Sequence, residues 1–195
     1  MPVWKVFFLE MLTRFFCGLR FFVPLGRIFL RAYYLSGLRS AGVFAPASTQ
    51  LDGPVRVVGT GKVRLGEYCR LGRDVLFETQ GNAEIVLGDH VRINDGSIIA
   101  AHAGITIGDD ALIGEYVSIR DADHGMVNGE LIRKQTHLAA SIRIGNDAWI
   151  SRGCCVLKGV AIGDGAVIGA NSVVTRDAPA LSICVGAPAR EIRKR

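Results

Sequence analysis

Large branched aliphatic residues recur at every sixth position near the C-terminal end of the chain: Ile144, Ile150, Val156, Ile162, Ile168 and Val174. Four residues after each of the first five, the side chain is compact: Ala148, Cys154, Val160, Ala166 and Ser172. A period of six fits neither an amphipathic helix, which places apolar residues at i, i+3 and i+4, nor a half-buried strand, which alternates strictly. The pattern therefore predicts short straight segments that are joined by corners.

The same repeat extends towards the N-terminus in runs of three large residues. These runs are Ile107, Ile113 and Ile119; Leu87, Ile93 and Ile99; and, more weakly, Leu65, Leu71 and Phe77. The runs are separated by slips of a few residues and by one long interval after Ile119. Three sides followed by a slip describe a triangular coil, and stacked coils would form parallel strands about 4.8 Å apart around an aliphatic core.

The C-terminal segments IGDGAVIGANSVVTRDAP, residues 162–179, and VGAPAREIRKR, residues 185–195, carry a family resemblance. They resemble the hexapeptide-repeat acyltransferases, which include galactoside, maltose and xenobiotic O-acetyltransferases and enzymes that acetylate bacterial surface polysaccharides. The resemblance covers roughly Leu65 to Arg195. It implies an all-β fold, a left-handed parallel β-helix, and a homotrimer with active sites between subunits. It also implies acetyl-CoA as co-substrate and a saccharide as acceptor.

Residues 1–46 differ in kind from residues 47–195, which we predict to form the β-helix domain. Eleven of the 15 aromatic residues lie in this first segment. It also carries six basic residues against one acidic residue, whereas the rest of the chain has 17 of each and is neutral. No basic stripe or recognition motif indicates nucleic-acid binding.

The first segment is predicted to be an amphipathic helical extension. One helical run extends from Trp4 to Arg20, and a second, from about Arg27 to Leu38, follows a break at Pro24 and Gly26. Neither run reaches the ~18 uncharged apolar residues of a spanning helix. Aromatic residues opposite an arginine face indicate peripheral contact with a membrane interface. The alternative is that the helices pack on a neighbouring subunit or cap the open end of the β-helix.

The cysteines and the absence of a clear signal peptide indicate a cytoplasmic protein, with the inner face of the cytoplasmic membrane as the place of any peripheral contact. The number of cysteines is odd, five. Cys69 and Cys154 occupy compact inward positions of the repeat, where a thiol packs as a small hydrophobe. A reducing compartment is therefore expected rather than a disulfide framework.

The repeat is abandoned between residues 120 and 141, in a segment that we expect to be the catalytic loop. By the family resemblance, His124 is the base that accepts a proton from the acceptor hydroxyl, a role suited to imidazole near neutral pH. Asp121 or Asp123 could orient its ring, and the sequence leaves that choice open.

Three residues are candidates for binding the acceptor. Asn94 matches the family's acceptor-binding position and is followed by Asp95; the alternative for Asn94 is a corner residue in the left-handed conformation. His102 stands at the same corner as His124 one coil earlier, as a wall of the acceptor site or a structural corner residue. His90 and His137 are expected to be solvated.

Two other classes of function remain open at this point. A metalloenzyme resembling γ-class carbonic anhydrases would need histidines in an H-x-x-x-x-H spacing, which this sequence lacks, so no metal is expected. A non-catalytic β-helix scaffold would need none of these side chains.

The family resemblance also implies a set of donor-binding residues along the last coils. The main-chain N–H of Arg152 would stabilise the oxyanion of the transition state. Gly169 and Ala170 would lie along the pantetheine arm. Thr175 and Arg176 match the family's Thr-Lys pair, and the guanidinium can bind phosphate through two hydrogen bonds. The further phosphate candidates are Arg190 and Arg193. Lys158 departs from the proline common in relatives.

Overall fold

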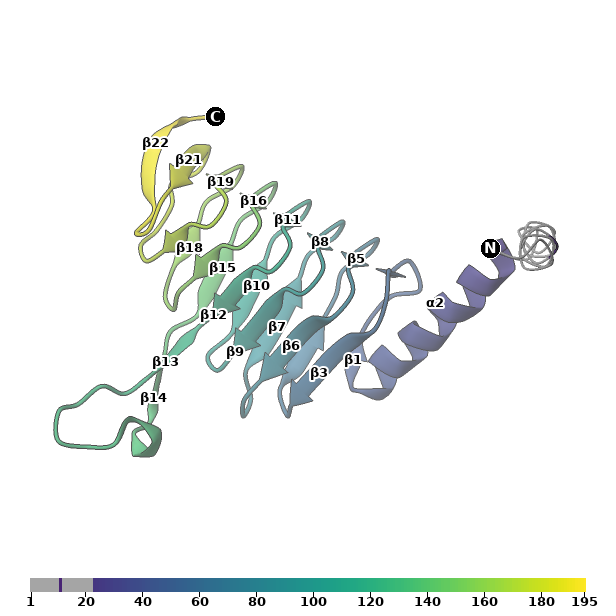
Figure 1. The fold of residues 1–195 in the computed structure, drawn as a ribbon, viewed down its shortest axis with the longest axis horizontal. Coiled ribbons are helices and arrows are strands. Elements are labelled where there is room, and N and C mark those ends of the chain that lie inside the picture. Colours follow the sequence, from purple (N-terminus) through teal and green to yellow (C-terminus); the bar gives the residue numbers. More distant parts are fainter. Residues whose placement is uncertain (1–10, 12–22) are drawn as a thin grey trace, which may run out of the picture. The chain divides into compact units, whose positions relative to one another are not determined.

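The computed structural model describes Met11 and residues 23–195 (Figure 1). The chain forms two compact units, Met1–Tyr33 and Tyr34–Arg195. Apart from Met11, the predicted first helical run from Trp4 to Arg20 lies outside the described residues. No helix within the described residues is long and apolar enough to cross a membrane.

Residues 43–194 wind around three sheets of short strands, one on each side of a triangular prism (Figure 1). Sheet A contains β1 (Val43–Phe44), β4 (Lys62–Arg64), β7 (Glu84–Leu87), β10 (Ile105–Ile107), β15 (Ile142–Ile144) and β18 (Ala161–Ile162). Sheet B contains β2 (Gln50–Leu51), β5 (Arg70–Leu71), β8 (Arg92–Ile93), β11 (Leu112–Ile113), β16 (Trp149–Ile150), β19 (Val167–Ile168), β21 (Ser182–Val185) and β22 (Arg190–Lys194). Sheet C contains β3 (Val55–Gly59), β6 (Val75–Thr79), β9 (Ile98–Ala101), β12 (Ser118–Arg120), β17 (Cys155–Val156) and β20 (Val173–Val174). All neighbours in these sheets are parallel except β21 and β22, which are antiparallel. The predicted parallel β-helix of hexapeptide repeats is confirmed.

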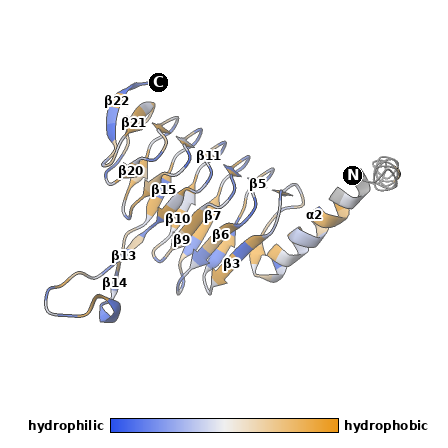
Figure 2. Cartoon of the chain, viewed as in Figure 1, coloured by the Kyte–Doolittle hydropathy of each residue, from blue (hydrophilic) through white to orange (hydrophobic). Residues whose placement is uncertain are grey.

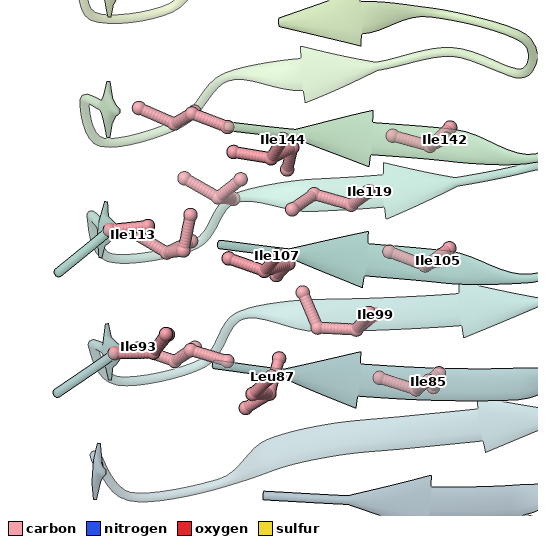
Figure 3. Close-up of a cluster of buried hydrophobic side chains, with 14 of the residues drawn as sticks. Ile85, Leu87, Ile93, Ile99, Ile105, Ile107, Ile113, Ile119, Ile142 and Ile144 are labelled. Atoms are coloured by element: carbon pink, nitrogen blue, oxygen red, sulfur yellow. The ribbon is translucent and has the colours of Figure 1, made fainter. Parts of the chain in front are cut away.

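The core is the aliphatic ladder that the six-residue period predicts. Ile85, Ile105 and Ile142 pair in register on neighbouring strands and stack above one another (Figure 3). Ile93 and Ile113 do the same on sheet B. All five side chains are buried, and burying each stabilises the fold by about 2 kcal/mol. Figure 2 shows the apolar residues concentrated on the strands.

The corners between sheets A and B are held by a ladder of acidic and amide side chains. Asp89, Asp109, Asn146 and Asp164 each accept a hydrogen bond from a main-chain N–H of the preceding coil, at 2.7 to 2.8 Å. From the second to the sixth coil, one residue per coil at this corner has a positive φ, for example His90 at 58° and Asp147 at 50°. The corner geometry therefore repeats from coil to coil.

The first coil is more regular than the sequence indicated. Residues 45–61, which precede the first predicted run of large residues, lie largely within the coil of β1, β2 and β3, which pairs with the next coil on all three sides. The β-helix thus begins at Val43, slightly before the predicted boundary at residue 47. Ala45, Leu51 and Val57 keep the six-residue step.

Helix α2 spans Val23–Ser40 and contains the predicted second helical run. The second helical run begins earlier than predicted, because Pro24 and Gly26, where the break was expected, lie in the first turn of α2 as described. Proline is tolerated there, since the first N–H groups of a helix have no intrahelical partner. Within the second unit, Leu38 is buried in the core and Tyr34 packs against it, so the end of α2 caps the first coil.

Candidate functional site

A β-hairpin interrupts the fourth coil at the corner between sheets C and A, which we call the C–A corner. Strand β13 (Ala122–His124) pairs antiparallel with β14 (His137–Ala139), and the short 3-10 helix η2 (Ile132–Lys134) lies in the connection. The hairpin projects from the side of the β-helix (Figure 1). The segment expected as the catalytic loop is thus an ordered arm with His124 near its base.

Asp121 anchors the start of this hairpin to the preceding coil. Its side chain is buried and accepts hydrogen bonds from the main-chain N–H groups of His102, Ala103 and Gly104, at 2.6, 2.8 and 2.6 Å. Both carboxylate oxygens are therefore occupied by the main chain. The structure places Asp121 in an anchoring position and not against the ring of His124.

Asp123 forms an ion pair with Lys158, which stands at the C–A corner of the next coil. Both side chains are partly exposed. The sequence offered no account of Lys158, and the structure shows that it ties the hairpin to the following coil. The hairpin is thus held from both sides, by Asp121 to the coil before it and by Asp123 to the coil after it.

Three histidine rings form a row at the base of the hairpin. His124 and His137 are directly opposite each other in the β13–β14 register, and their ring centroids are 4.4 Å apart. The centroids of His102 and His137 are 4.8 Å apart. The sequence predicted that His102 lies near His124, and His137 is exposed as expected, but its contacts with the two other rings were not predicted. The sequence could have indicated these contacts only if the 12 residues between His124 and His137 had been recognised as the connection of a β-hairpin.

The histidines line a pocket of about 700 Å³, a size typical of small-molecule sites. The remaining lining residues are Glu78, Gln80, Arg120, Ala122, Asp123, Met126 and Ile132. Glu78 and Arg120 flank Ala100 in register across sheet C, and their charged groups meet at 3.7 Å. The small side chain of Ala100 lies between these two residues and is itself buried.

Asn94 and Asp95 lie elsewhere, at the corner between sheets B and C, which we call the B–C corner. The Asn94 amide donates to Glu115 at 2.9 Å, and Asp95 accepts from the main-chain N–H of Arg73 at 2.8 Å. Neither residue lines the histidine pocket. The alternative reading of Asn94 as a left-handed corner residue is wrong, because that conformation falls on Gly96, with φ 68°.

Arg152, Gly169 and Ala170 share this B–C corner on later coils. Gly114 packs directly against Arg152, since a Cβ on Gly114 would lie 2.5 Å from the main-chain nitrogen of Arg152. Gly169 is close to Val185, which a Cβ would approach to 2.6 Å. The predicted site residues are therefore divided between two corners of the prism, with His124 at one corner and Arg152 at another.

The main-chain N–H of Arg152 makes no hydrogen bond within residues 23–195. The equivalent N–H of Arg73 is bonded to the side chain of Asp95 on the next coil. The coil after Arg152 presents Ala170 at the matching position, and its methyl group accepts no hydrogen bond. The exposed corner at Arg152 therefore offers a donor to a ligand.

Cys154 supports the same corner from inside. Burial raises the pKa of this thiol, and its sulfur contacts the main-chain oxygen of Gly169 at 3.0 Å as a hydrogen-bond donor. The expectation that Cys154 is a packing residue agrees with its buried position.

The predicted phosphate-binding residues are only partly brought together. Thr175 and Arg176 are exposed at the C–A corner of the sixth coil. Arg176 and Arg190 line a second pocket of about 120 Å³, together with Asp177 and Glu191. Arg193 lies further along β22, opposite Ile183, and does not line this pocket.

No group of three or more His, Cys, Asp or Glu side chains is arranged to hold a metal ion in the part of the chain that the structure describes. The fourth histidine, His90, stacks on Tyr68 with ring centroids 5.1 Å apart. It belongs to the corner between sheets A and B and does not line the histidine pocket.

Comparisons with known proteins agree with the fold and the repeat. Residues 141–176 match the family model for the bacterial transferase hexapeptide (six repeats). The chain is 32% identical to the putative lipopolysaccharide biosynthesis O-acetyl transferase WbbJ of Escherichia coli over 72% of its own length and 76% of the relative. It is 35% identical to the galactoside O-acetyltransferase of the same organism, over 67% of its own length and 63% of that enzyme.

Among solved structures, the chain is similar to a hexapeptide-repeat-containing acetyltransferase of Vibrio cholerae complexed with acetyl coenzyme A. The identity is 25% and the TM-score 0.56, and the match covers 91% of this chain and 87% of the other.

Proposed function

This chain belongs to the hexapeptide-repeat acetyltransferase family, and on that basis we propose that it transfers an acetyl group from acetyl-CoA to a hydroxyl group of a saccharide, with His124 as the general base. The observation that carries the proposal is the pocket at the base of the hairpin. His124, which matches the family's catalytic histidine in the sequence, lines this pocket, and the pocket is large enough for a sugar. The names of two relatives, a putative lipopolysaccharide biosynthesis O-acetyl transferase and a galactoside O-acetyltransferase, support a saccharide acceptor.

The chemistry needs a base and an oxyanion donor. His124 accepts the hydroxyl proton while the acceptor oxygen attacks the thioester carbonyl carbon. The carbonyl oxygen becomes an oxyanion, which the main-chain N–H of Arg152 stabilises. The tetrahedral intermediate then expels the coenzyme A thiolate, and the imidazolium returns its proton to that sulfur.

The two halves of this machinery come from two copies of the chain. His124 stands at the C–A corner, whereas Arg152, Gly169, Ala170 and the candidate acceptor residues Asn94 and Asp95 stand at the B–C corner. A homotrimer that sets one copy's C–A corner beside the next copy's B–C corner completes the site. Gly169 and Ala170 then face the pantetheine arm, and the cationic candidates for the coenzyme phosphates are Arg176, beside Thr175, and Arg190 and Arg193.

An apolar row on sheet B supports assembly into a trimer. Leu112 and Trp149 are in register on β11 and β16 and are exposed by 46% and 49%. An exposed row of large apolar side chains is typical of a contact surface.

Peripheral membrane contact through the N-terminal segment is a further part of the proposal. On α2, Ile28, Phe29, Leu30 and Tyr33 are 50 to 73% exposed. A helix with this many exposed apolar side chains is suited to a membrane interface, which would place the protein on the inner face of the cytoplasmic membrane. A double change, Ile28→Glu with Phe29→Glu, should abolish binding to anionic liposomes, and Ile192→Glu on β22 is the matched control. Equal binding by both variants would reject the membrane part.

A thiol-release assay tests the activity itself. Acetyl-CoA is supplied with a panel of nucleotide sugars and isolated glycans, and free coenzyme A is followed. His124→Ala should reduce transfer by about two to four orders of magnitude, while binding of coenzyme A stays unchanged. Unchanged transfer by this variant would indicate that another group is the base. Absence of transfer by the wild-type protein to every acceptor would reject the proposed activity.

A further inference from the structure

We propose that His137 is a positioning residue whose ring holds the imidazole of His124 in the orientation that accepts the acceptor proton. The inference rests on the proposed function and deepens it, because the role of His124 defines what the positioning is for.

Within residues 23–195, no carboxylate forms a hydrogen bond with the ring of His124. The oxygens of Asp121 are bonded to three main-chain N–H groups, and Asp123 is paired with Lys158. The hydrogen bonds among residues 23–195 include none to the ring of His124. A base on a projecting hairpin, with an exposed side chain, therefore needs another means of restraint.

The ring of His137 supplies that restraint. Its centroid is 4.4 Å from that of His124, and the two ring planes are tilted by 43°. Contacts of this geometry between aromatic rings are favourable beyond the area that they bury. Because His124 and His137 are opposite each other in an antiparallel pair, their side chains stand on the same face of the hairpin.

His137 is itself braced by the rigid β-helix. Its other neighbour is His102, with centroids 4.8 Å apart and a tilt of 54°. His102 follows β9 and is half-buried, and its main-chain N–H is bonded to Asp121. The row of rings thus runs from a fixed coil through His137 to His124.

The hairpin connection fixes the register that places His137 in this row. The side chain of Gln135 accepts a hydrogen bond from the N–H of Val127 at 2.8 Å and donates to the main-chain oxygen of Glu130 at 3.0 Å. Gly125 donates to the main-chain oxygen of Thr136 at 3.1 Å. These bonds stop the strands from sliding, and a slip of one residue would turn His137 to the opposite face.

Two substitutions distinguish the contribution of the His137 ring as a whole from that of its nitrogen atoms. His137→Ala removes the ring, whereas His137→Phe keeps a ring of similar shape without a group that binds protons. His90→Ala is the matched control, because His90 also contacts an aromatic ring but lies at a different corner. Initial rates with acetyl-CoA and an accepted glycan give kcat and KM for each protein.

The chain contains four histidines, so carbon-13 labelling of their Cε1 atoms gives four ring signals that single substitutions assign. The position and width of the His124 signal report whether its ring is held. This reading does not depend on turnover. If the wild-type protein shows no acetyl transfer, the proposed function fails while the spectrum still tests whether His137 holds His124.

We expect His137→Ala to lower kcat roughly ten-fold, with KM for acetyl-CoA unchanged, and to move the His124 signal to the position of free histidine. His137→Phe should keep kcat within about three-fold of wild type and keep the His124 ring ordered. The proposal is overturned if His137→Ala leaves kcat and the His124 signal unchanged. It is also overturned if His137→Phe is as slow as His137→Ala, because the nitrogen atoms would then be what matters.

Discussion

Removal of the Asp121 carboxylate tests whether the placement of the hairpin depends on this buried anchor. Its three hydrogen bonds are 2.6 to 2.8 Å long, and each involves a charged acceptor, which makes a bond worth about 1.5 to 3 kcal/mol. The three share one carboxylate, so their contributions do not add fully. We therefore expect Asp121→Ala to weaken local closure of the corner by about 3 to 5 kcal/mol.

Hydrogen exchange of main-chain amides is the direct assay, because it reports local opening separately from global unfolding. The amides of His102, Ala103 and Gly104 should exchange faster by a factor of about 100 or more. The rest of the β-helix, such as the amide of Ile98, should exchange as in wild type. Acetyl transfer should fall with little change in KM for acetyl-CoA, since the hairpin carries His124.

Asp109→Ala is the matched control for this experiment. Asp109 also accepts from a main-chain N–H of the preceding coil, but through a single hydrogen bond of 2.8 Å at an exposed corner. Its loss should cost less than about 1.5 kcal/mol and leave transfer intact. If Asp121→Ala leaves exchange at residues 102–104 unchanged, or has no more effect than Asp109→Ala, the anchoring role is refuted.

Three further predictions concern other parts of the chain. Lys158→Met breaks the partly exposed ion pair with Asp123. It should lower the free energy of unfolding in denaturant by less than about 1 kcal/mol but lower kcat several-fold. An unchanged kcat would contradict the role of Lys158 as the second anchor of the hairpin. Trp149→Glu should convert the proposed trimer to monomers in light scattering, whereas Val58→Glu, at an exposed position on β3, should not. Burial raises the pKa of the Cys69 thiol from 9.0 to about 11. The unfolded chain therefore loses this proton first, and the free energy of unfolding should be steady below pH 9 and fall between pH 9 and 11. In denaturant titrations, the free energy of unfolding of Cys69→Ala should fall less between pH 9 and 11 than that of the wild-type protein. Identical pH profiles for the two proteins would refute the contribution of Cys69.

The fold was predictable from the sequence because its core contacts are set by a local repeat. Ile144 and Ile150 occupy equivalent places on successive sides of one coil, so a six-residue step along the chain maps directly onto one side of the prism. The same step in Ala45, Leu51 and Val57 marks the first coil, but Pro46 and Pro54 obscured it. Prolines are tolerated at these corners because neither lies within a strand.

The candidate site was predictable only in part. His124 stood out because the repeat stops around it, and His102 because it occupies the same corner one coil earlier. The division of the predicted residues between two corners was not visible in the spacing of Asn94, Arg152 and His124. It follows from which corner of the triangle each residue occupies.

The sequence by itself determined the coil, its core and the place where the chain leaves it, since a large and a compact residue every six positions allow little else. Only the tertiary structure decided what surrounds His124. It directed Asp121 to the main chain of the previous coil, paired Asp123 with Lys158, and brought His137 between two other imidazoles. These contacts depend on hairpin register and on the stacking of coils, which bring together residues 13 to 35 positions apart that no local period connects.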